Sequence, residues 1–231
     1  MNSSVKTPDW SQITAVFGGA FDPPHLGHKT AALGLLQTPG VKKVLILPTG
    51  NPALKNSKIS AHHRAEMAKL CFDHPNLTID LREIKKAETN PAEPSYSFNT
   101  LQELKKEQGP LAFVIGADQI QDLHRWYRFP ELLNQCHWIV LTRKPHGLEA
   151  ALPTLKTFEA SQLIKNLGHS PQGHPLWSTK SNTTLIIVPT EAREISSTQL
   201  RELMARDESQ AKPHLSPEVL AYLKKNHLYG T

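Results

Sequence analysis

Near the start of this 231-residue chain the sequence reads ITAVFGGAFDPPHLGHKTAALGLL, residues 13–36, and this stretch decides the fold. Its first five residues are apolar and partly β-branched, which predicts a buried strand over 13–17. Two glycines follow, where the backbone can approach a ligand because no Cβ stands in the way. Pro23 and Pro24 end the strand, and a helical pattern covers residues 26–36. A strand, a glycine turn and a helix N-terminus in this order are typical of an anion-binding site.

Two histidines, His25 and His28, stand three residues apart at the start of this helix and therefore face the same way. Histidines at this spacing are most often ordinary surface residues. As a metal site the pair is weak, because no further Cys or His stands at ligand spacing nearby. Their place directly after the glycine turn favours a phosphate-binding function. The sequence therefore predicts an anion site here and no metal held by the protein.

Strand and helix patterns alternate along the rest of the chain. Apolar runs predict strands over residues 13–17, 41–47, 77–81, 111–115, 138–142 and 184–188. Helical patterns cover residues 26–36, 61–72, 98–106, 119–135 (with an interruption expected at Pro130), 198–206 and 217–226. Several strands are continuous apolar runs, as expected where both faces of a sheet are covered. The alternation predicts an α/β fold, a Rossmann-like doubly wound, mostly parallel sheet with helices on both faces, whose ligands bind beyond the carboxyl ends of the strands.

One stretch, residues 147–182, does not fit this alternation. It is rich in Pro, Gly, His and Ser, and it contains one short helical pattern over 157–167. His169 and His174 flank a turn containing Pro and Gly, but they form a weak metal candidate. We expect an insertion or long surface loop at 147–182 within a single domain that spans residues 1–231.

Composition limits the classes of partner. The formal net charge of +5 suits anionic ligands, but the lysines lie in scattered pairs, and no basic run with interleaved aromatics indicates nucleic-acid binding. Cys71 and Cys136 lie in apolar stretches and are expected to be buried thiols in a reducing compartment. The first residues lack the apolar core of a signal peptide, and no span approaches the roughly 18 apolar residues of a membrane helix. We expect a cytoplasmic protein with no membrane partner.

Two motifs resemble signatures of the nucleotidyltransferase α/β superfamily. The first is the stretch Gly18–His28 with its His25-x-Gly27-His28 core, and the second, ISSTQLR at residues 195–201, is similar to the Ile-Ser-Ser-Thr-x-[Ile/Leu]-Arg motif of that superfamily. Between them, further blocks are similar, in the same order, to bacterial nicotinate-nucleotide adenylyltransferases. These blocks are LPTGNP (47–52), DLRE (80–83), PSYS (94–97), and FVIGAD (113–118) with Trp126 after it. The resemblance covers most of the chain.

This resemblance implies transfer of AMP from ATP to nicotinate mononucleotide, with release of pyrophosphate and formation of deamido-NAD. The nucleophile is the phosphate of the mononucleotide, which is largely dianionic at pH 7 because the second pKa of a phosphomonoester is about 6. No protein base is then needed, and the protein has to align the in-line attack and stabilise the developing charge. Magnesium is expected to bind through the phosphates of ATP, because no acidic cluster in the sequence indicates a metal cage.

The resemblance also implies roles for individual residues. The catalytic residues are His25, His28 and Arg201. The ATP-binding residues are Gly18, Gly19, Gly116, Asp118, Ser197 and Thr198. The residues that bind the acceptor, with Trp126 stacking on its pyridine ring, are Lys55, Tyr96, Ser97, Trp126 and Tyr127.

Ordinary structural roles compete with several of these assignments. Asp118 is also a good candidate for a helix N-cap, and Ser196 or Ser197 for another. A tryptophan such as Trp126 within a helical pattern more often belongs to the core. The sequence alone does not decide between these structural roles and the ligand-binding roles.

The chain departs from the family pattern at two positions. Ala20 stands where the family usually has Thr or Ser, and Leu54 replaces a His that commonly precedes Lys55. Neither change removes His25, His28 or Arg201. Beside the leading interpretation the sequence leaves open a related enzyme for nicotinamide mononucleotide, one for another phosphorylated acceptor such as phosphopantetheine, or a nucleotide-binding regulator without turnover. A homo-oligomer is compatible with the sequence, which does not decide the oligomeric state.

Overall fold

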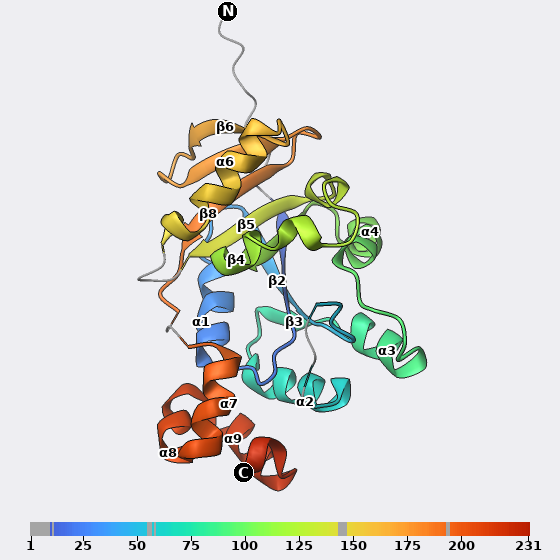
Figure 1. Cartoon of the computed structure of the whole chain (residues 1–231), viewed down its shortest axis with the longest axis vertical. Coiled ribbons are helices and arrows are strands. Elements are labelled where there is room, and N and C mark those ends of the chain that lie inside the picture. Colours follow the sequence, from blue (N-terminus) through green and yellow to red (C-terminus); the bar gives the residue numbers. More distant parts are fainter. Residues whose placement is uncertain (1–9, 11, 55–56, 58, 143–146, 193–194) are drawn as a thin grey trace, which may run out of the picture.

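The computed structural model describes residues 10, 12–54, 57, 59–142, 147–192 and 195–231. Its described strands form one eight-stranded sheet in the order β3-β2-β1-β4-β5-β8-β7-β6 (Figure 1). The strands are β1 (Ile13–Gly19), β2 (Val41–Pro48), β3 (Leu77–Ile79), β4 (Leu111–Gly116), β5 (His137–Thr142), β6 (Ile164–His169), β7 (Pro175–Thr179) and β8 (Thr184–Pro189). In this spatial order, the neighbouring strands β3, β2, β1, β4, β5 and β8 all pair in parallel. Strand β7 pairs antiparallel with both β8 and β6. The predicted mostly parallel, doubly wound sheet is confirmed, with its direction of winding reversing between β1 and β4.

Helices cover both faces of this sheet. The longer helices are α1 (Leu26–Leu35), α2 (Ala61–Cys71), α3 (Arg82–Thr89), α4 (Ser97–Gln108), α6 (Leu152–Ala160), α7 (Ser197–Arg206) and α9 (Pro217–Lys225), and α5 (Ala117–Ile120) and α8 (Glu208–Ala211) are single turns. Ala15 and Phe17 of β1 pack in one cluster with residues of α1, α2, α7 and α9. Val16, which points to the opposite face, packs in a second cluster with residues of α4 and α6. The core therefore lies in two layers, one on each side of the sheet.

The predicted helix over 119–135 is wrong. The chain forms the single turn α5, then two 3-10 turns, Leu123–Arg125 and Glu131–Asn134, joined by an irregular segment. In that segment Arg128 has a φ of 59°, and its guanidinium lies 4.4 Å from the ring centroid of Phe98. Tertiary contacts of this kind override a helical pattern in the sequence.

The stretch 147–182 is not a long loop, and the predicted helix over 157–167 is also wrong. Helix α6 ends at Ala160, and Gln162, with a φ of 56°, turns the chain into β6. Strands β6 and β7 form an antiparallel hairpin that extends the sheet beyond β8. His169 and His174 lie at the two sides of its turn, where Ser170 N donates to His174 O at 2.8 Å. Whether this stretch is an insertion into a single domain remains a prediction.

No helix in the described part of the chain is both long enough and apolar enough to cross a membrane.

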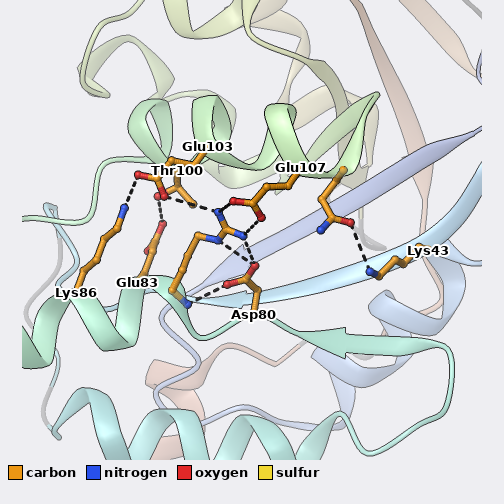
Figure 2. A network of polar contacts seen from close by, with 9 residues as sticks. Lys43, Asp80, Glu83, Lys86, Thr100, Glu103 and Glu107 are labelled. Carbon is orange, nitrogen blue, oxygen red and sulfur yellow. Dashed lines mark hydrogen bonds and ion pairs between the residues drawn. The ribbon is translucent and has the colours of Figure 1, made fainter.

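Helix α3, which the sequence patterns did not predict, is joined to α4 by charged side chains (Figure 2). Arg82 donates from Nε to Asp80 Oδ2 at 2.9 Å and from Nη1 to Glu107 Oε1 at 3.0 Å. Lys86 Nζ lies 2.5 Å from Glu103 Oε1. Since the Lys86, Glu103 and Glu107 side chains are largely exposed, the pairs that they form contribute little to the free energy of unfolding, whereas the pair of Arg82 with Asp80 is mostly buried.

Glu83, on the inner side of α3, is buried instead (Figure 2). Its carboxylate accepts a hydrogen bond from Thr100 Oγ1 at 2.7 Å and another from the backbone N–H of Gly50. Burial raises the pKa of Glu83, and the two hydrogen bonds oppose that shift because they stabilise the charged form. Glu83 thereby joins α4 to the loop that follows β2.

Arg64 of α2 holds the same loop from the other side. Its side chain is only 1% exposed, and Nη2 donates to Gly50 O at 2.5 Å. Nη1 donates to Thr49 O and, at 2.9 Å, to Ala20 O. Burial lowers the pKa of the Arg64 guanidinium, and the charge of Asp22 nearby partly offsets this. The loops that follow β1 and β2 are therefore fixed to one buried cation.

We expect Arg64→Met to lower the free energy of unfolding by about 3 kcal/mol, because three carbonyl oxygens lose their buried donor. The control is Lys86→Met, whose side chain and partner Glu103 are both largely exposed, and it should cost about 1 kcal/mol or less. Urea unfolding of both variants and the unchanged protein measures the difference. Equal losses in the two variants would contradict the special role of Arg64.

Candidate active site

The two glycines at the end of β1 lie beside the end of β2. Gly18 pairs with Leu47 and Gly19 with Pro48. A Cβ on Gly18 would lie 3.1 Å from the ring of Phe113, and one on Gly19 would lie 3.0 Å from the ring of Phe21. A side chain at either position would therefore be in tight contact with these rings, which would have to shift slightly to admit it.

His25 and His28 hold each other at the start of α1. His25 is the N-cap residue, and its Nδ1 accepts from His28 N at 3.4 Å, while His28 Nδ1 accepts from His25 N at 3.3 Å. The two rings stack with centroids 3.7 Å apart and planes at 27°. Because each Nδ1 is an acceptor, each neutral ring carries its proton on Nε2 and is a donor there.

This reciprocal pairing confirms that the two imidazoles lie on the first turn and face the same way. They differ in access, because His25 is buried and His28 is partly exposed. At this helix end, N–H donors and the positive end of the helix dipole combine to favour an anion.

The second motif meets the first, although the two lie far apart in the sequence. Ser196 is the N-cap of α7, accepting from Gln199 N at 3.1 Å, which settles that Ser197 is not the cap. Ser197 Oγ donates to Pro23 O at 2.9 Å. Arg201 Nη1 donates to Asp22 O at 2.5 Å, and its Nη2 donates to Thr198 Oγ1 at 3.1 Å. The N-terminal part of α7 is thus fixed against the loop that leads into α1.

Gly116 and Asp118 stand at the end of β4, next to β1 in the sheet. The N-cap of α5 is Gly116, whose N–H donates to Gln119 Oε1 at 3.0 Å, so Asp118 is not the cap. The Asp118 side chain is exposed. A Cβ on Gly116 would lie 2.4 Å from Asp118 Oδ1, so a larger residue there would displace this carboxylate.

Aromatic residues surround the N-terminus of α4. Tyr96 is the N-cap residue and Ser97 the first residue of the helix. The ring of Tyr96 stacks on that of Tyr127, with centroids 4.4 Å apart. Trp126 lies after a 3-10 turn rather than within a long helix, is partly buried, and packs edge-on against Phe113 at 6.1 Å. The structure therefore groups these acceptor candidates near the ends of β2 and β4.

The sequence also drew attention to Lys55, Leu54 and Ala20. Lys55 lies outside the described residues. The Leu54 side chain is 50% exposed, which is unusual for a leucine. This exposure is consistent with a position where the family commonly has a polar residue, histidine. Ala20 lacks a hydroxyl, but its carbonyl accepts from Arg64.

Three residues that hold these loops were missed by the sequence analysis: Asp22, Arg64 and Tyr229. The position of Asp22 inside the first motif is a usable signal. Arg64 lies on the helix face that buries Met67, Ala68 and Cys71, and a charge on such a face points to a structural cation. Tyr229, whose hydroxyl donates to Asp22 Oδ1, has no signal in the sequence.

Within the described ranges no three or more His, Cys, Asp or Glu side chains come together as they would to bind a metal ion.

Comparison with known proteins supports the resemblance. A family model described as cytidylyltransferase-like matches residues 16–203. A curated protein of Pectobacterium atrosepticum is 32% identical over 225 residues, covering 94% of this chain and 98% of its own. One of Klebsiella pneumoniae subsp. pneumoniae is 31% identical over 229 residues, covering 96% and 99%. Both carry the name "Probable nicotinate-nucleotide adenylyltransferase".

A solved structure with the same fold is the Plasmodium falciparum nicotinic acid mononucleotide adenylyltransferase, described as complexed with NaAD. It has a TM-score of 0.69 and 17% sequence identity, and covers 94% of this chain and 97% of its own. The family match extends over most of the chain, and relatives above 30% identity align along nearly their whole length. The chain therefore belongs to the cytidylyltransferase-like family and, within it, to the bacterial nicotinate-nucleotide adenylyltransferases.

Proposed function

We propose that this protein transfers AMP from ATP to nicotinate mononucleotide, giving deamido-NAD and pyrophosphate by direct in-line displacement. Family membership supports the reaction class. The single observation that carries the mechanism is the meeting of the two motifs, where Ser197 and Arg201 hydrogen-bond to the loop that carries His25 and His28. We therefore expect the phosphate-binding groups of the two motifs, which lie far apart in the sequence, to contact the same ATP molecule.

The chemistry requires donors rather than a base. In the reaction, the mononucleotide phosphate forms a bond to the α-phosphorus of ATP, and the bond from that phosphorus to pyrophosphate breaks. Negative charge builds up on the α-phosphate and on the leaving group. We assign His28, through Nε2–H, to the α-phosphate, and Arg201 to the β- and γ-phosphates. His25 supports the same phosphates and fixes the ring of His28.

The other ATP contacts follow from position. Gly18 and Gly19 leave room for the nucleotide at the end of β1, and Gly116 with Asp118 is assigned to the ribose. Ser197 and Thr198 belong with Arg201 at the triphosphate. Magnesium is the divalent metal we expect, carried by the ATP phosphates, because the described residues offer it no cage of carboxylates.

The acceptor is assigned to the N-terminus of α4. Its 12 residues supply a dipole whose positive end, at Tyr96 and Ser97, favours the carboxylate of nicotinate over the neutral amide of nicotinamide. Backbone N–H groups near Ser97 and Tyr127 are the expected donors to that carboxylate. Trp126 is assigned to stack on the pyridine ring, and Lys55 to the acceptor phosphate.

The acceptor preference is tested by pyrophosphate release. We expect kcat/KM to be about tenfold or more higher with nicotinate than with nicotinamide mononucleotide, because of the charge at the helix end, and no turnover with phosphopantetheine. A preference for either other acceptor would assign the protein to a related enzyme. No pyrophosphate with any acceptor would indicate a nucleotide-binding regulator instead.

The role of His28 is tested by His28→Ala and His28→Gln. A glutamine at this position can still accept from the His25 N–H and preserve the capping box, and its amide N–H can also donate to a phosphate, whereas an alanine has neither group. We expect kcat to fall by ~10²–10³ in His28→Ala with little change in KM for ATP, as for the loss of an oxyanion donor, and to fall less in His28→Gln. Full activity of His28→Ala would exclude His28 from stabilising the α-phosphate.

The stacking role of Trp126 is tested by Trp126→Ala, with Trp126→Phe as the control, since a phenylalanine keeps an aromatic face for the pyridine ring. We expect the first variant to raise KM for the pyridine nucleotide about tenfold through the lost stacking, and the second to change it much less. Steady-state kinetics with varied acceptor measures both constants. An unchanged KM in Trp126→Ala would confine Trp126 to packing against Phe113.

A further inference from the structure

The loop that follows β2 also holds the segment that leads into α4. Thr49 N donates to Gly19 O at 2.9 Å, so this loop begins against the end of β1. Two residues later, Asn51 N donates to Ser95 Oγ at 3.0 Å, and Asn51 O accepts from Ser95 N at 2.8 Å. Next to them, Pro52 and Ser95 form an isolated parallel bridge. The loop and the segment before α4 are therefore paired like two short strands.

The side chain of Asn51 strengthens the same junction. Its Nδ2 donates to Pro91 O at 2.9 Å and to Glu93 O at 3.3 Å. Two more hydrogen bonds of this segment are local, because Glu93 N donates to Asn90 O at 3.2 Å and Asn90 Nδ2 donates to Glu93 Oε2 at 3.1 Å. These local bonds shape the turn without tying it to the loop after β2. Asn51 thus joins that loop to both ends of the segment 91–95.

The position of this segment matters because α4 begins directly after it. Among the described residues, the N-cap Tyr96 makes no side-chain hydrogen bond to the first turn of α4. The N–H groups of that turn therefore take their place from the backbone that leads into the helix. Glu83 holds the helix further on, through Thr100, so α4 as a whole does not depend on Asn51. The contacts of Asn51 bear on the start of the helix alone.

Resting on the proposed function, we propose that Asn51 is a positioning residue for the acceptor. It fixes the start of α4 so that the N–H groups near Ser97 are directed to the carboxylate of nicotinate mononucleotide. Hydrogen bonds to a charged acceptor are stronger than those to a neutral amide, so displaced donors weaken the binding of nicotinate more than that of nicotinamide. The ATP side keeps its geometry without Asn51, because Arg64 holds the carbonyls of Thr49 and Gly50.

The test is Asn51→Ala, with Asn90→Ala as the matched control. The amide of Asn90 donates to the side chain of Glu93 and does not reach the loop after β2. We expect Asn51→Ala to raise KM for nicotinate mononucleotide about fivefold or more, with KM for ATP and KM for nicotinamide mononucleotide nearly unchanged. The preference for nicotinate over nicotinamide, as a ratio of kcat/KM values, should fall by the same factor. Asn90→Ala should leave the three constants and this ratio unchanged.

A second variant, Ser95→Ala, weakens the same junction without altering the Asn51 side chain. It removes the acceptor of the Asn51 N–H and should lower the preference for nicotinate as well. Calorimetric titration of each variant with nicotinate mononucleotide measures the loss of affinity directly.

A merely structural role of Asn51 would weaken both acceptors alike. An equal rise of KM for the two acceptors, or an unchanged preference in Asn51→Ala and Ser95→Ala, would therefore overturn the proposal. Failure of the proposed function, by contrast, would appear in the unchanged protein, as missing pyrophosphate release or as a preference for another acceptor.

Discussion

The buried guanidinium of Arg64 is the contact on which the arrangement of the site depends. The loops that follow parallel strands have no ladder of hydrogen bonds of their own, and they must leave backbone groups free for a ligand. Apolar packing alone therefore cannot fix them. Arg64 instead donates to the carbonyl of Ala20 in the loop after β1 and to the carbonyls of Thr49 and Gly50 in the loop after β2. The cost of burying its charge is offset by these three carbonyls and by the charges of Asp22 and Glu83 nearby.

The same network extends from the nucleotide side to the acceptor side. The carbonyl of Gly50 accepts from Arg64, and its N–H donates to Glu83, which also accepts from Thr100 in α4. A Cβ on Gly50 would lie 2.0 Å from Glu83 O, so only glycine allows this close approach. The ends of β1 and β2 and the start of α4 thus have fixed relative positions. An in-line displacement between two bound substrates requires that kind of alignment more than it requires reactive side chains.

The parts that could be predicted from the sequence are those whose signal is local. The central strands are continuous apolar runs, and the order of motifs placed their ligand-facing residues at carboxyl ends. The hairpin of β6 and β7 was missed because β6 is a polar edge strand, with a shifted register between Asn166 and Gly168, and therefore lacks an apolar run. The irregular segment around Arg128 and the contacts of Tyr229 depend on residues distant in sequence. No pattern within a window of 10 to 20 residues contains that information.

The spacing of His25 and His28 has one physical explanation that covers both structure and chemistry. In a capping box the N-cap residue and the third helical residue exchange hydrogen bonds with each other's backbone N–H. When both residues are histidines, this exchange uses Nδ1 of each ring and leaves Nε2–H as the donor. The two hydrogen bonds that cap the helix therefore also select the tautomer with its proton on Nε2 in both rings. A site that stabilises phosphate charge needs a ring N–H donor at a helix N-terminus, and this spacing orients the accessible ring of His28 for that role, with the buried His25 as its support.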